Sequence, residues 1–351
     1  MSERGDEIAG WFERQAQSCQ ELGSSLWAGV LPAMAQNVRS HGVIWEILET
    51  RPANRFGDAA PLRLLGQAHR MALAGEAPEL AAVLPSCGGQ SSLGHPPQLI
   101  LDLMAEQPDQ FAAALTKPPQ TNEVARAAGL IAGLLAVSQR YRQALRLCEV
   151  GCSGGLNLRM DHFRYQSNGH AMGPTASPVQ LIDLWDLDPG FQPGAIAIVD
   201  RAGCDPDPVD VLTSDGARWL ESFVWPDQAA RRQRLRGAIE LAARVPAAIE
   251  QSHDTAGWLR QQLDQPTPGV TTVVYHSIVW QYIEKDQRAA ITAEIVVAGT
   301  QATHDTPLVW MMFEPDPTDR SQVAVTLRMW PGNVSLRLAS ADFHGRWVKL
   351  G

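Results

Sequence analysis

An apolar run from Leu145 to Val150 ends in the glycine-rich turn Gly151-Cys152-Ser153-Gly154-Gly155, and the hydrophobic pattern of the chain changes at this point. Before it, apolar residues recur at helical spacing and no strand-like alternation is visible. After it, short runs rich in β-branched and aromatic residues alternate with helical stretches. Such alternation predicts a parallel sheet that is covered on both faces. We therefore expect an α/β fold that is preceded by an all-helical region.

The change of pattern divides the 351-residue chain into two expected domains. Residues 1–140 form a helical N-terminal cap region, and residues 141–351 form a Rossmann-like domain with an insertion at about 160–195 that is expected to form a lid or an edge hairpin. We expect strands at 145–150, 195–199, 245–249, 270–275, 308–313, 323–329 and 334–338, and helices at 227–243, 255–263 and 286–299. Trp330-Pro331-Gly332-Asn333 separates the last two strands, which should therefore form an antiparallel hairpin.

Charge and cysteine content argue against several classes of protein. The formal net charge is −9, so long-range attraction to a phosphate backbone is absent and nucleic acid is not an expected partner. No apolar stretch is long enough to span a bilayer and no secretory signal is visible, so we expect a cytoplasmic protein. Five cysteines without a Cys-x-x-Cys pair indicate a reducing compartment and no metal site.

The glycine-rich turn has the composition of a ligand-binding loop. Gly151 permits a backbone conformation that a Cβ disfavours, and Gly155 lets the main chain approach a ligand. Glu149 is placed to accept a hydrogen bond or to face a cationic group, and the helix expected after the turn presents backbone N–H groups. The spacing Gly-x-x-Gly-Gly does not match the dinucleotide fingerprint Gly-x-Gly-x-x-Gly. The alternative interpretation is a tight turn without a ligand.

The stretch Glu149 to Leu158 resembles the first motif of class I S-adenosylmethionine-dependent methyltransferases. More narrowly, the chain is similar to a bacterial family known only as a domain of unknown function. The stretches that carry this second resemblance are 120–124, 149–158, 203–205, 224–228, 276–282 and 343–347. The resemblance implies a seven-stranded methyltransferase-type sheet and S-adenosylmethionine as the cofactor. The cofactor contacts that it implies come from Glu149, Gly151, Ser153, Gly155 and Asn157.

Carboxylates after the second and third strands complete the expected cofactor site, since the ligand of such a fold lies across the carboxyl ends of the strands. By resemblance, a carboxylate after the second strand holds the ribose, and Asp205 is preferred over Asp200 and Asp207. The alternative role of Asp205 is to cap a helix near Val209. Asp254 is expected to reach the adenine amino group, to cap the following helix, or to do both.

The end of the fourth strand is more polar than packing requires. His276, Gln281 and Tyr282 are therefore the candidate catalytic residues, with His276 as general base. A base is needed only if the acceptor must lose a proton, because methyl transfer otherwise depends on positioning. The alternative for His276 is an imidazole that is hydrogen-bonded to the backbone at a strand end.

The expected function is methyl transfer to a small-molecule acceptor. The candidate substrate-binding residues are Asn122, Glu123, Trp225, Trp280, His344 and Arg346. One alternative is a non-catalytic protein that binds or senses S-adenosylmethionine, and the polar end of the fourth strand favours an enzyme over it. A second alternative is a nicotinamide-dependent oxidoreductase, which the turn spacing and the closing hairpin disfavour.

Overall fold

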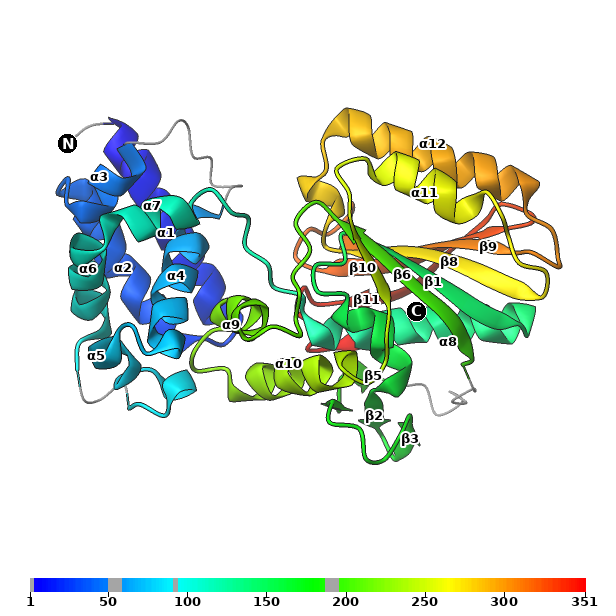
Figure 1. The fold of residues 1–351 in the computed structure, drawn as a ribbon, viewed down its shortest axis with the longest axis horizontal. Coiled ribbons are helices and arrows are strands. Elements are labelled where there is room, and N and C mark those ends of the chain that lie inside the picture. The colour runs from blue at the N-terminus through cyan, green and yellow to red at the C-terminus, as the bar shows by residue number, and fades with distance from the viewer. Residues whose placement is uncertain (1–2, 50–58, 91–93, 187–195) are drawn as a thin grey trace. The chain divides into compact units, whose positions relative to one another are not determined.

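The structure, a computed structural model, describes residues 3–49, 59–90, 94–186 and 196–351. The chain forms two compact units (Figure 1). The helical unit comprises Met1–Thr121 and Thr213–Gln233, and the sheet unit comprises Asn122–Leu212 and Arg234–Gly351. This division differs from the expected boundary near residue 140 in two respects. The helix that precedes the first strand belongs to the sheet unit, and a short segment from the second half of the chain belongs to the helical unit.

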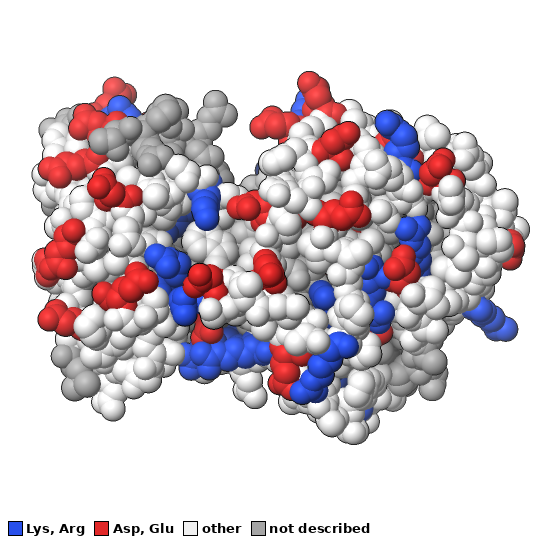
Figure 2. All heavy atoms as spheres, viewed as in Figure 1, with Lys and Arg blue, Asp and Glu red and all other residues white. Residues whose placement is uncertain are grey.

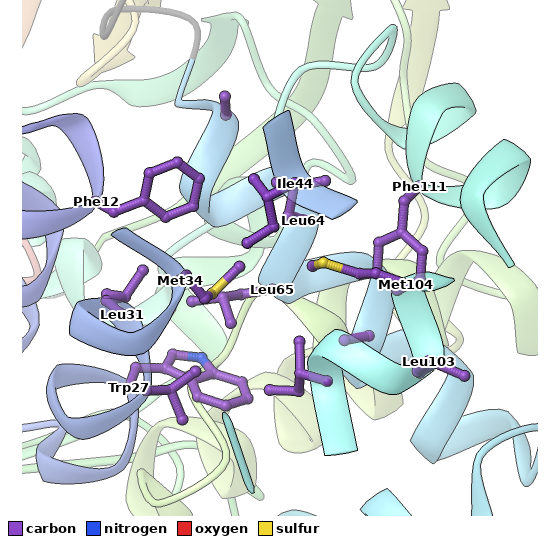
Figure 3. Close-up of a cluster of buried hydrophobic side chains, with 14 of the residues drawn as sticks. Phe12, Trp27, Leu31, Met34, Ile44, Leu64, Leu65, Leu103, Met104 and Phe111 are labelled. Atoms are coloured by element: carbon purple, nitrogen blue, oxygen red, sulfur yellow. The ribbon is translucent and has the colours of Figure 1, made fainter. Parts of the chain in front are cut away.

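The described part of the helical unit consists of helices around one apolar core. The helices are α1 (Glu3–Glu21), α2 (Ser25–Arg39), α3 (Val43–Glu49), α4 (Ala60–Ala74), α5 (Pro78–Ala81), α6 (Pro96–Glu106), α7 (Pro108–Ala114) and α9 (Ser214–Ser222), with a 3₁₀ turn η2 (Pro85–Cys87). In the core, Phe12, Trp27, Leu64 and Phe111 are almost fully buried and converge from four of these helices (Figure 3). Burial of each such side chain stabilises the unit by about 1.5–3 kcal/mol.

The sheet unit is built on a mixed sheet that has nine strands in the described residues, in the order β5-β12-β11-β10-β9-β8-β1-β6-β7. The strands are β1 (Ala144–Val150), β5 (Trp185–Asp186), β6 (Ile198–Asp205), β7 (Ala248–Gln251), β8 (Val270–Ser277), β9 (Leu308–Pro315), β10 (Val323–Trp330), β11 (Val334–Ala341) and β12 (Val348–Leu350). From β7 to β9, neighbouring strands are parallel. From β9 to β12, they are antiparallel.

Helices cover both faces of this sheet (Figure 1). They are α8 (Ala127–Tyr141), α11 (Thr255–Leu263) and α12 (Lys285–Gln301). The sheet unit also contains the 3₁₀ segments η4 (Val124–Arg126), η5 (Leu156–His162) and η6 (Trp280–Tyr282). The chain passes from the helical unit to the sheet unit within α10 (Ala229–Ala242). Helix α8 lies on one face, and α11 and α12 lie on the other. A Cβ at Gly129 or Gly133 of α8 would approach Phe313 or Met311 of β9 to within 2.7 or 2.3 Å. The small residues of α8 thus permit its close packing on the sheet.

The structure confirms the α/β class, the N-terminal helical region and the closing antiparallel hairpin, which is β10–β11. The bounds of α11 coincide with the expected helix 255–263. The sheet has more than the expected seven strands because two short strands extend the edge beyond β11: β12 pairs with β11 antiparallel, and β5 pairs with β12 in parallel.

Two of the expected strands lie later in the chain than the apolar pattern indicated. β6 extends to Asp205 rather than ending at 199, because Asp200 and Arg201 in its first half are accommodated by ion pairs with Arg146 and Asp161. β7 begins at 248 rather than 245, since Val245 still donates its N–H to Leu241 at the end of α10. The start of the expected strand at 195 lies outside the described residues.

The insertion after β1 folds into a small sheet of its own. It contains β2 (Arg164–Ser167), β3 (His170–Met172) and β4 (Gln180–Ile182), and β2 and β3 form a hairpin. The last residues of the insertion, 187–195, lie outside the described part. The α-helix expected directly after the glycine-rich turn is instead the seven-residue 3₁₀ segment η5, which is kinked at Arg159. Within the described ranges, no helix has the length and apolar composition required to cross a membrane.

Candidate functional site

The carboxyl ends of β6, β1 and β8 lie side by side in the sheet unit. Numbered along the chain, the five parallel strands have the order 3-2-1-4-5, so the direction of winding reverses between β1 and β8. In open α/β sheets, ligands bind outside the carboxyl ends of the strands at this switch point. The segments that leave the three strands there are the glycine-rich turn after Val150, the loop after Asp205 and the loop after Ser277.

The glycine-rich turn is held to β6 by backbone and side-chain hydrogen bonds. The N–H groups of Gly151 and Cys152 both donate to the carbonyl of Cys204, at 2.8 and 3.1 Å. Gly151 has φ +67°, and a Cβ there would lie 2.3 Å from Val279 Cγ2 in the loop after β8. A Cβ at Gly155, with φ +63°, would lie 2.5 Å from Ile249 Cδ1. Close packing against protein neighbours therefore accounts for both glycines.

Asp205 fixes the turn from the end of β6. One of its carboxylate oxygens accepts the N–H of Ser153 at 2.9 Å, and the other accepts the N–H of Asp207 at 2.9 Å. Asp205 does not cap a helix near Val209, because the next helix begins only at Ser214. Asp200 lies inside β6 in an ion pair with Arg146, away from the carboxyl end. Of the three carboxylates considered for the ribose, Asp205 and Asp207 lie at this edge.

Glu149 is a buried carboxyl group beside the turn. Its side chain is 2% exposed, and its Oε2 accepts the Tyr275 hydroxyl at 3.1 Å from the directly paired position on β8. Burial raises the pKa of Glu149 to about 8, although the hydrogen bond from Tyr275 and the charges of Arg159 and Arg126 act in the opposite direction. At neutral pH the group is therefore mainly protonated, and a cation placed beside it would favour the ionised form.

The two arginines near Glu149 tie the loops of this edge together. Arg159 donates to the carbonyls of Gly155 and Val245, at 2.6 and 2.9 Å. Arg126 donates to the carbonyls of Ser277 and Phe343, at 3.1 and 3.0 Å. Arg126 thus links η4, the end of β8 and the C-terminal turn.

Two polar atoms of the turn region are buried without a hydrogen-bond partner among the residues that the structure describes. They are Ser153 Oγ and Asn157 Oδ1, and the two residues are 6% and 1% exposed. The backbone N–H of Ser153 and the Nδ2 of Asn157 are bonded, to Asp205 and to the carbonyl of Glu123. Because most buried polar atoms are hydrogen-bonded, these two atoms mark a place where a ligand or water completes the site.

Asn122 and Glu123, two of the candidate substrate-binding residues, lie before β1 and support the turn region. Asn122 Oδ1 accepts the N–H of Leu156 at 3.1 Å, and Glu123 caps the short segment η4. Asn122 has φ +29° and Ser153 has φ +53°, and Ile278, directly after β8, has φ +51°. A positive φ is strained for a β-branched residue, and such strain often occurs at functional sites. Three non-glycine residues with positive φ therefore lie in segments that meet at this edge, and Ile278 is the strained one among them.

His276 forms a second buried polar cluster at the end of β8. Its Nδ1 lies 2.6 Å from Glu314 Oε1 at the end of β9, and its ring stacks on Trp280 with centroids 4.7 Å apart. Glu314 Oε1 also accepts the backbone N–H groups of Val279 and Trp280, at 3.1 and 3.2 Å. The alternative role, a histidine bonded to the backbone, is wrong, because Nδ1 bonds a carboxylate. Sequence reasoning missed Glu314, although it directly follows the expected strand 308–313.

The other predicted residues are not gathered in one place. Gln281 and Tyr282 are exposed, Tyr282 at 65%, and Asp254 is an exposed N-cap that accepts the N–H of Gly257. Trp225 is buried in the core of the helical unit, where Arg231 lies over its ring. Arg346 bonds Asp342 within its own turn at 2.6 Å. His344, in the same turn, is partly buried.

Asp227, which lies just before α10, bonds the start of a different helix. Its carboxylate accepts the Ser24 hydroxyl at 2.7 Å and the Leu26 N–H at 2.9 Å, at the start of α2. It therefore stabilises the helical unit rather than the start of α10.

A cavity of about 420 Å³ lies at the opposite, amino end of the sheet. Arg146, Asp200 and Gln262 are among its lining residues, and Arg146 donates to the side chains of the other two. Since ligands of open α/β sheets bind at the carboxyl ends of strands, we do not assign the functional site to this cavity.

Comparison with known proteins identifies a family but no individual similar protein. A family model described as an uncharacterized protein conserved in bacteria (DUF2332) matches residues 9–350. A search of the curated proteins found no match, and a search of the solved structures found none either. Because the family model spans nearly the whole of the 351-residue sequence, the chain belongs to this conserved bacterial family, DUF2332.

Proposed function

We propose that the sheet unit binds S-adenosylmethionine at the carboxyl ends of β1, β6 and β8 and transfers its methyl group to a small-molecule acceptor. The observation that carries the proposal is the glycine-rich turn at the switch point of the sheet, beside the buried, unbonded Ser153 Oγ and Asn157 Oδ1 of the described residues. A seven-stranded methyltransferase-type core, which is the nine-stranded sheet without β5 and β12, is the finer fold assignment that accompanies it. The parallel strands in the order 3-2-1-4-5 and the closing hairpin support that assignment.

The residues at this edge suit the chemistry of that cofactor. S-adenosylmethionine carries an ammonium group and a sulfonium group, and the sulfonium supplies a methyl group to a nucleophile. Glu149 would face the cationic part and ionise when it binds, because a nearby positive charge offsets the cost of burying a carboxylate. Ser153 Oγ and Asn157 Oδ1 would supply further hydrogen bonds. Asp205 would hold the turn and use its remaining lone pairs for hydroxyl groups.

The surface charge supports a small acceptor over a nucleic acid. The chain has 29 basic and 38 acidic residues. On the face seen in Figure 2, acidic and basic side chains are interspersed rather than sorted into one basic field. Because the net charge is −9, a phosphate backbone gains little from long-range attraction.

Calorimetric titration with S-adenosylhomocysteine tests the proposal directly. The wild-type protein should bind it, and Ser153→Ala should weaken binding about tenfold, the effect of one hydrogen bond. Ser153→Ala removes an oxygen without a bonded partner in the described residues, so the fold should be retained. Ser138→Ala is the matched control, because it removes another buried, unbonded hydroxyl, in α8. Absence of binding by the folded wild type would refute the proposal.

A second candidate is a non-catalytic protein that binds S-adenosylmethionine. It is favoured by the exposure of Gln281 and Tyr282, two of the three residues considered for catalysis. The two candidates differ in turnover, so we would incubate the protein with methyl-labelled cofactor and a library of small acceptors. Binding without label transfer to any acceptor would favour the second candidate. Stabilisation by a nicotinamide nucleotide, and not by S-adenosylhomocysteine, would favour an oxidoreductase instead.

A further inference from the structure

Three buried polar atoms without partners in the described residues belong to one cluster at the ends of β8 and β9. They are His276 Nε2, Trp310 Nε1 and Glu314 Oε2. The imidazole and the Trp310 ring have centroids 6.0 Å apart, and His276 and Glu314 are directly bonded. His276 is 1% exposed and Trp310 is 5% exposed. Three unsatisfied groups in contact are unusual, because each buried polar atom without a partner costs about 1–3 kcal/mol.

The bonds to Glu314 define the state of the imidazole. Glu314 Oε1 accepts two backbone N–H groups, from Val279 and Trp280, and it also meets His276 Nδ1. An oxygen that faces three donors requires Nδ1 to carry the proton. In the neutral imidazole, Nε2 is then bare and is a hydrogen-bond acceptor. Glu314 thus holds the ring in one tautomer with its basic nitrogen free.

The unsatisfied atoms form a complementary pair of donor and acceptor. Trp310 Nε1–H can only donate, and the bare His276 Nε2 accepts. A hydroxyl group has the matching chemistry, since it can donate its proton to an acceptor such as Nε2 and accept from a donor such as the indole N–H. Trp280, the partly exposed member of the cluster, stacks on His276 and packs edge-on against Trp310 at 5.6 Å, so the cluster is largely aromatic, as suits a flat ligand.

We propose that His276, Trp310 and Trp280 form the acceptor subsite for an aromatic hydroxyl compound, in which His276 Nε2 takes the hydroxyl proton and Glu314 is the positioning residue. The reaction part of this inference rests on the proposed methyl transfer. The proton leaves the hydroxyl for Nε2, and an oxygen lone pair forms the bond to the methyl carbon while the electrons of the broken sulfur–carbon bond stay on sulfur. In this reaction, the only chemical role assigned to the protein is that His276 Nε2 accepts the proton.

Nitrogen NMR of the imidazoles in the full-length, ¹⁵N-labelled protein tests the subsite without the cofactor. The His276 signal is identified by its loss in His276→Asn, a variant whose amide replaces Nδ1 and lacks Nε2. We expect a bare Nε2 that shifts saturably when phenol is added and does not shift with toluene, which has the same ring without the hydroxyl. In Glu314→Gln, the fixed tautomer should be lost and phenol should bind about tenfold more weakly, the loss of one hydrogen bond. Two results would overturn the proposal. One is a proton on Nε2 in the neutral imidazole of the wild-type protein, and the other is an equal response of the signal to phenol and toluene.

A series of phenols separates a proton acceptor from a structural histidine. With S-adenosylmethionine present, His276→Asn should slow methylation of phenol far more than methylation of 4-nitrophenol, which ionises near neutral pH and needs little help from a base. Equal loss for both would assign a structural role to His276, and no methylation of either by the wild type would overturn the aromatic acceptor. Circular dichroism of each variant shows that it has folded. Failure of the S-adenosylhomocysteine titration alone would remove the proposed function and leave the phenol subsite standing.

Discussion

Two buried histidines, one in each unit, differ in how completely their ring nitrogens are bonded. In the helical unit, His69 lies 2.9 Å from the carbonyl of Ser222 through Nδ1 and 2.8 Å from the Ser86 hydroxyl through Nε2. In the sheet unit, His276 bonds Glu314 through Nδ1, and its Nε2 meets no partner within the described residues. Both rings are at most 1% exposed, so burial alone does not distinguish them.

The difference separates a structural role from a functional one. Burial lowers the pKa of His69 to about 4, so the ring is neutral at physiological pH and both of its nitrogens are used inside the protein. A fully bonded polar group fixes the packing around it and has no capacity left for a ligand. The cluster around His276, like Ser153 and Asn157 at the neighbouring turn, retains bonding capacity. Incomplete bonding that is clustered at the carboxyl ends of the strands, rather than burial or residue type alone, is therefore what marks the site.

The largest effect should come from replacing the fully bonded histidine. His69→Leu leaves the Ser222 carbonyl and the Ser86 hydroxyl without their partner, at about 1–3 kcal/mol each. We expect the helical unit to lose about 4 kcal/mol of unfolding free energy, measured by urea titration followed by circular dichroism. His276→Asn, which breaks no bond at Nε2, should cost about 1 kcal/mol. Equal losses of unfolding free energy would show that the two histidines contribute equally to stability.

Glu149→Gln should change how stability depends on pH. Because burial raises the pKa of Glu149 from 4.5 to about 8, its favourable contribution is full below about pH 4.5, falls as pH rises to about 8 and is absent above that. Relative to wild type, the variant should therefore gain stability with pH, by at most about 1.4 kcal/mol per pH unit in this window. Thermal unfolding at a series of pH values measures this gain.

Tyr275→Phe tests the same pH range, from about 4.5 to about 8, through the hydrogen-bond partner of Glu149. The Tyr275 hydroxyl lowers the pKa of Glu149, so its removal should move the upper end of the window to higher pH. A pH profile of Glu149→Gln that runs parallel to wild type would contradict the assignment of a buried, neutral carboxyl group.

A smaller effect is expected at Asp254, where two roles were considered. Asp254→Ala removes the N-cap of α11 and should cost about 1 kcal/mol, whereas Asp254→Asn retains a capping oxygen and should cost much less. If Asp254 is only a cap, S-adenosylhomocysteine should bind both variants as it binds wild type. Weaker binding by Asp254→Asn, measured by calorimetry, would show that the carboxylate also contacts the ligand.

The smallest effect is expected at Tyr282, which the sequence favoured for catalysis. Its side chain is 65% exposed, so Tyr282→Ala should change stability by less than about 0.5 kcal/mol. Affinity for S-adenosylhomocysteine should also stay within about twofold of wild type, a difference of about 0.4 kcal/mol. A loss above tenfold in the same titration would mean that η6 contacts the bound ligand.

The sequence was informative where local pattern determines the structure. The periodicity of 255–263 and its cap at Asp254 give α11 with its observed bounds, and the glycine-rich turn indicates the switch point. β6 was shortened in the prediction because the charges of Asp200 and Arg201 interrupt its apolar run. Those charges are balanced by residues far along the chain, Arg146 and Asp161, which a local pattern does not reveal.

The candidate site was partly predictable for the same reason. Glu149, Ser153 and Asn157 adjoin one motif, so the motif identifies them together. Their partners depend on strand register, which sets Tyr275 opposite Glu149. Glu314 meets His276 through the pairing of β8 with β9, and the only sequence signal for it was a carboxylate directly after an apolar strand.

Hydrogen exchange with and without S-adenosylhomocysteine is the sharpest test of whether the incompletely bonded edge of the sheet unit binds the ligand, because it reports on both units in one experiment. We expect the ligand to slow exchange at residues 151–157 and 277–280 of the sheet unit and to leave exchange in α4, which carries His69, unchanged. Unchanged exchange at residues 151–157, at a ligand concentration that saturates any calorimetric binding, would contradict this expectation.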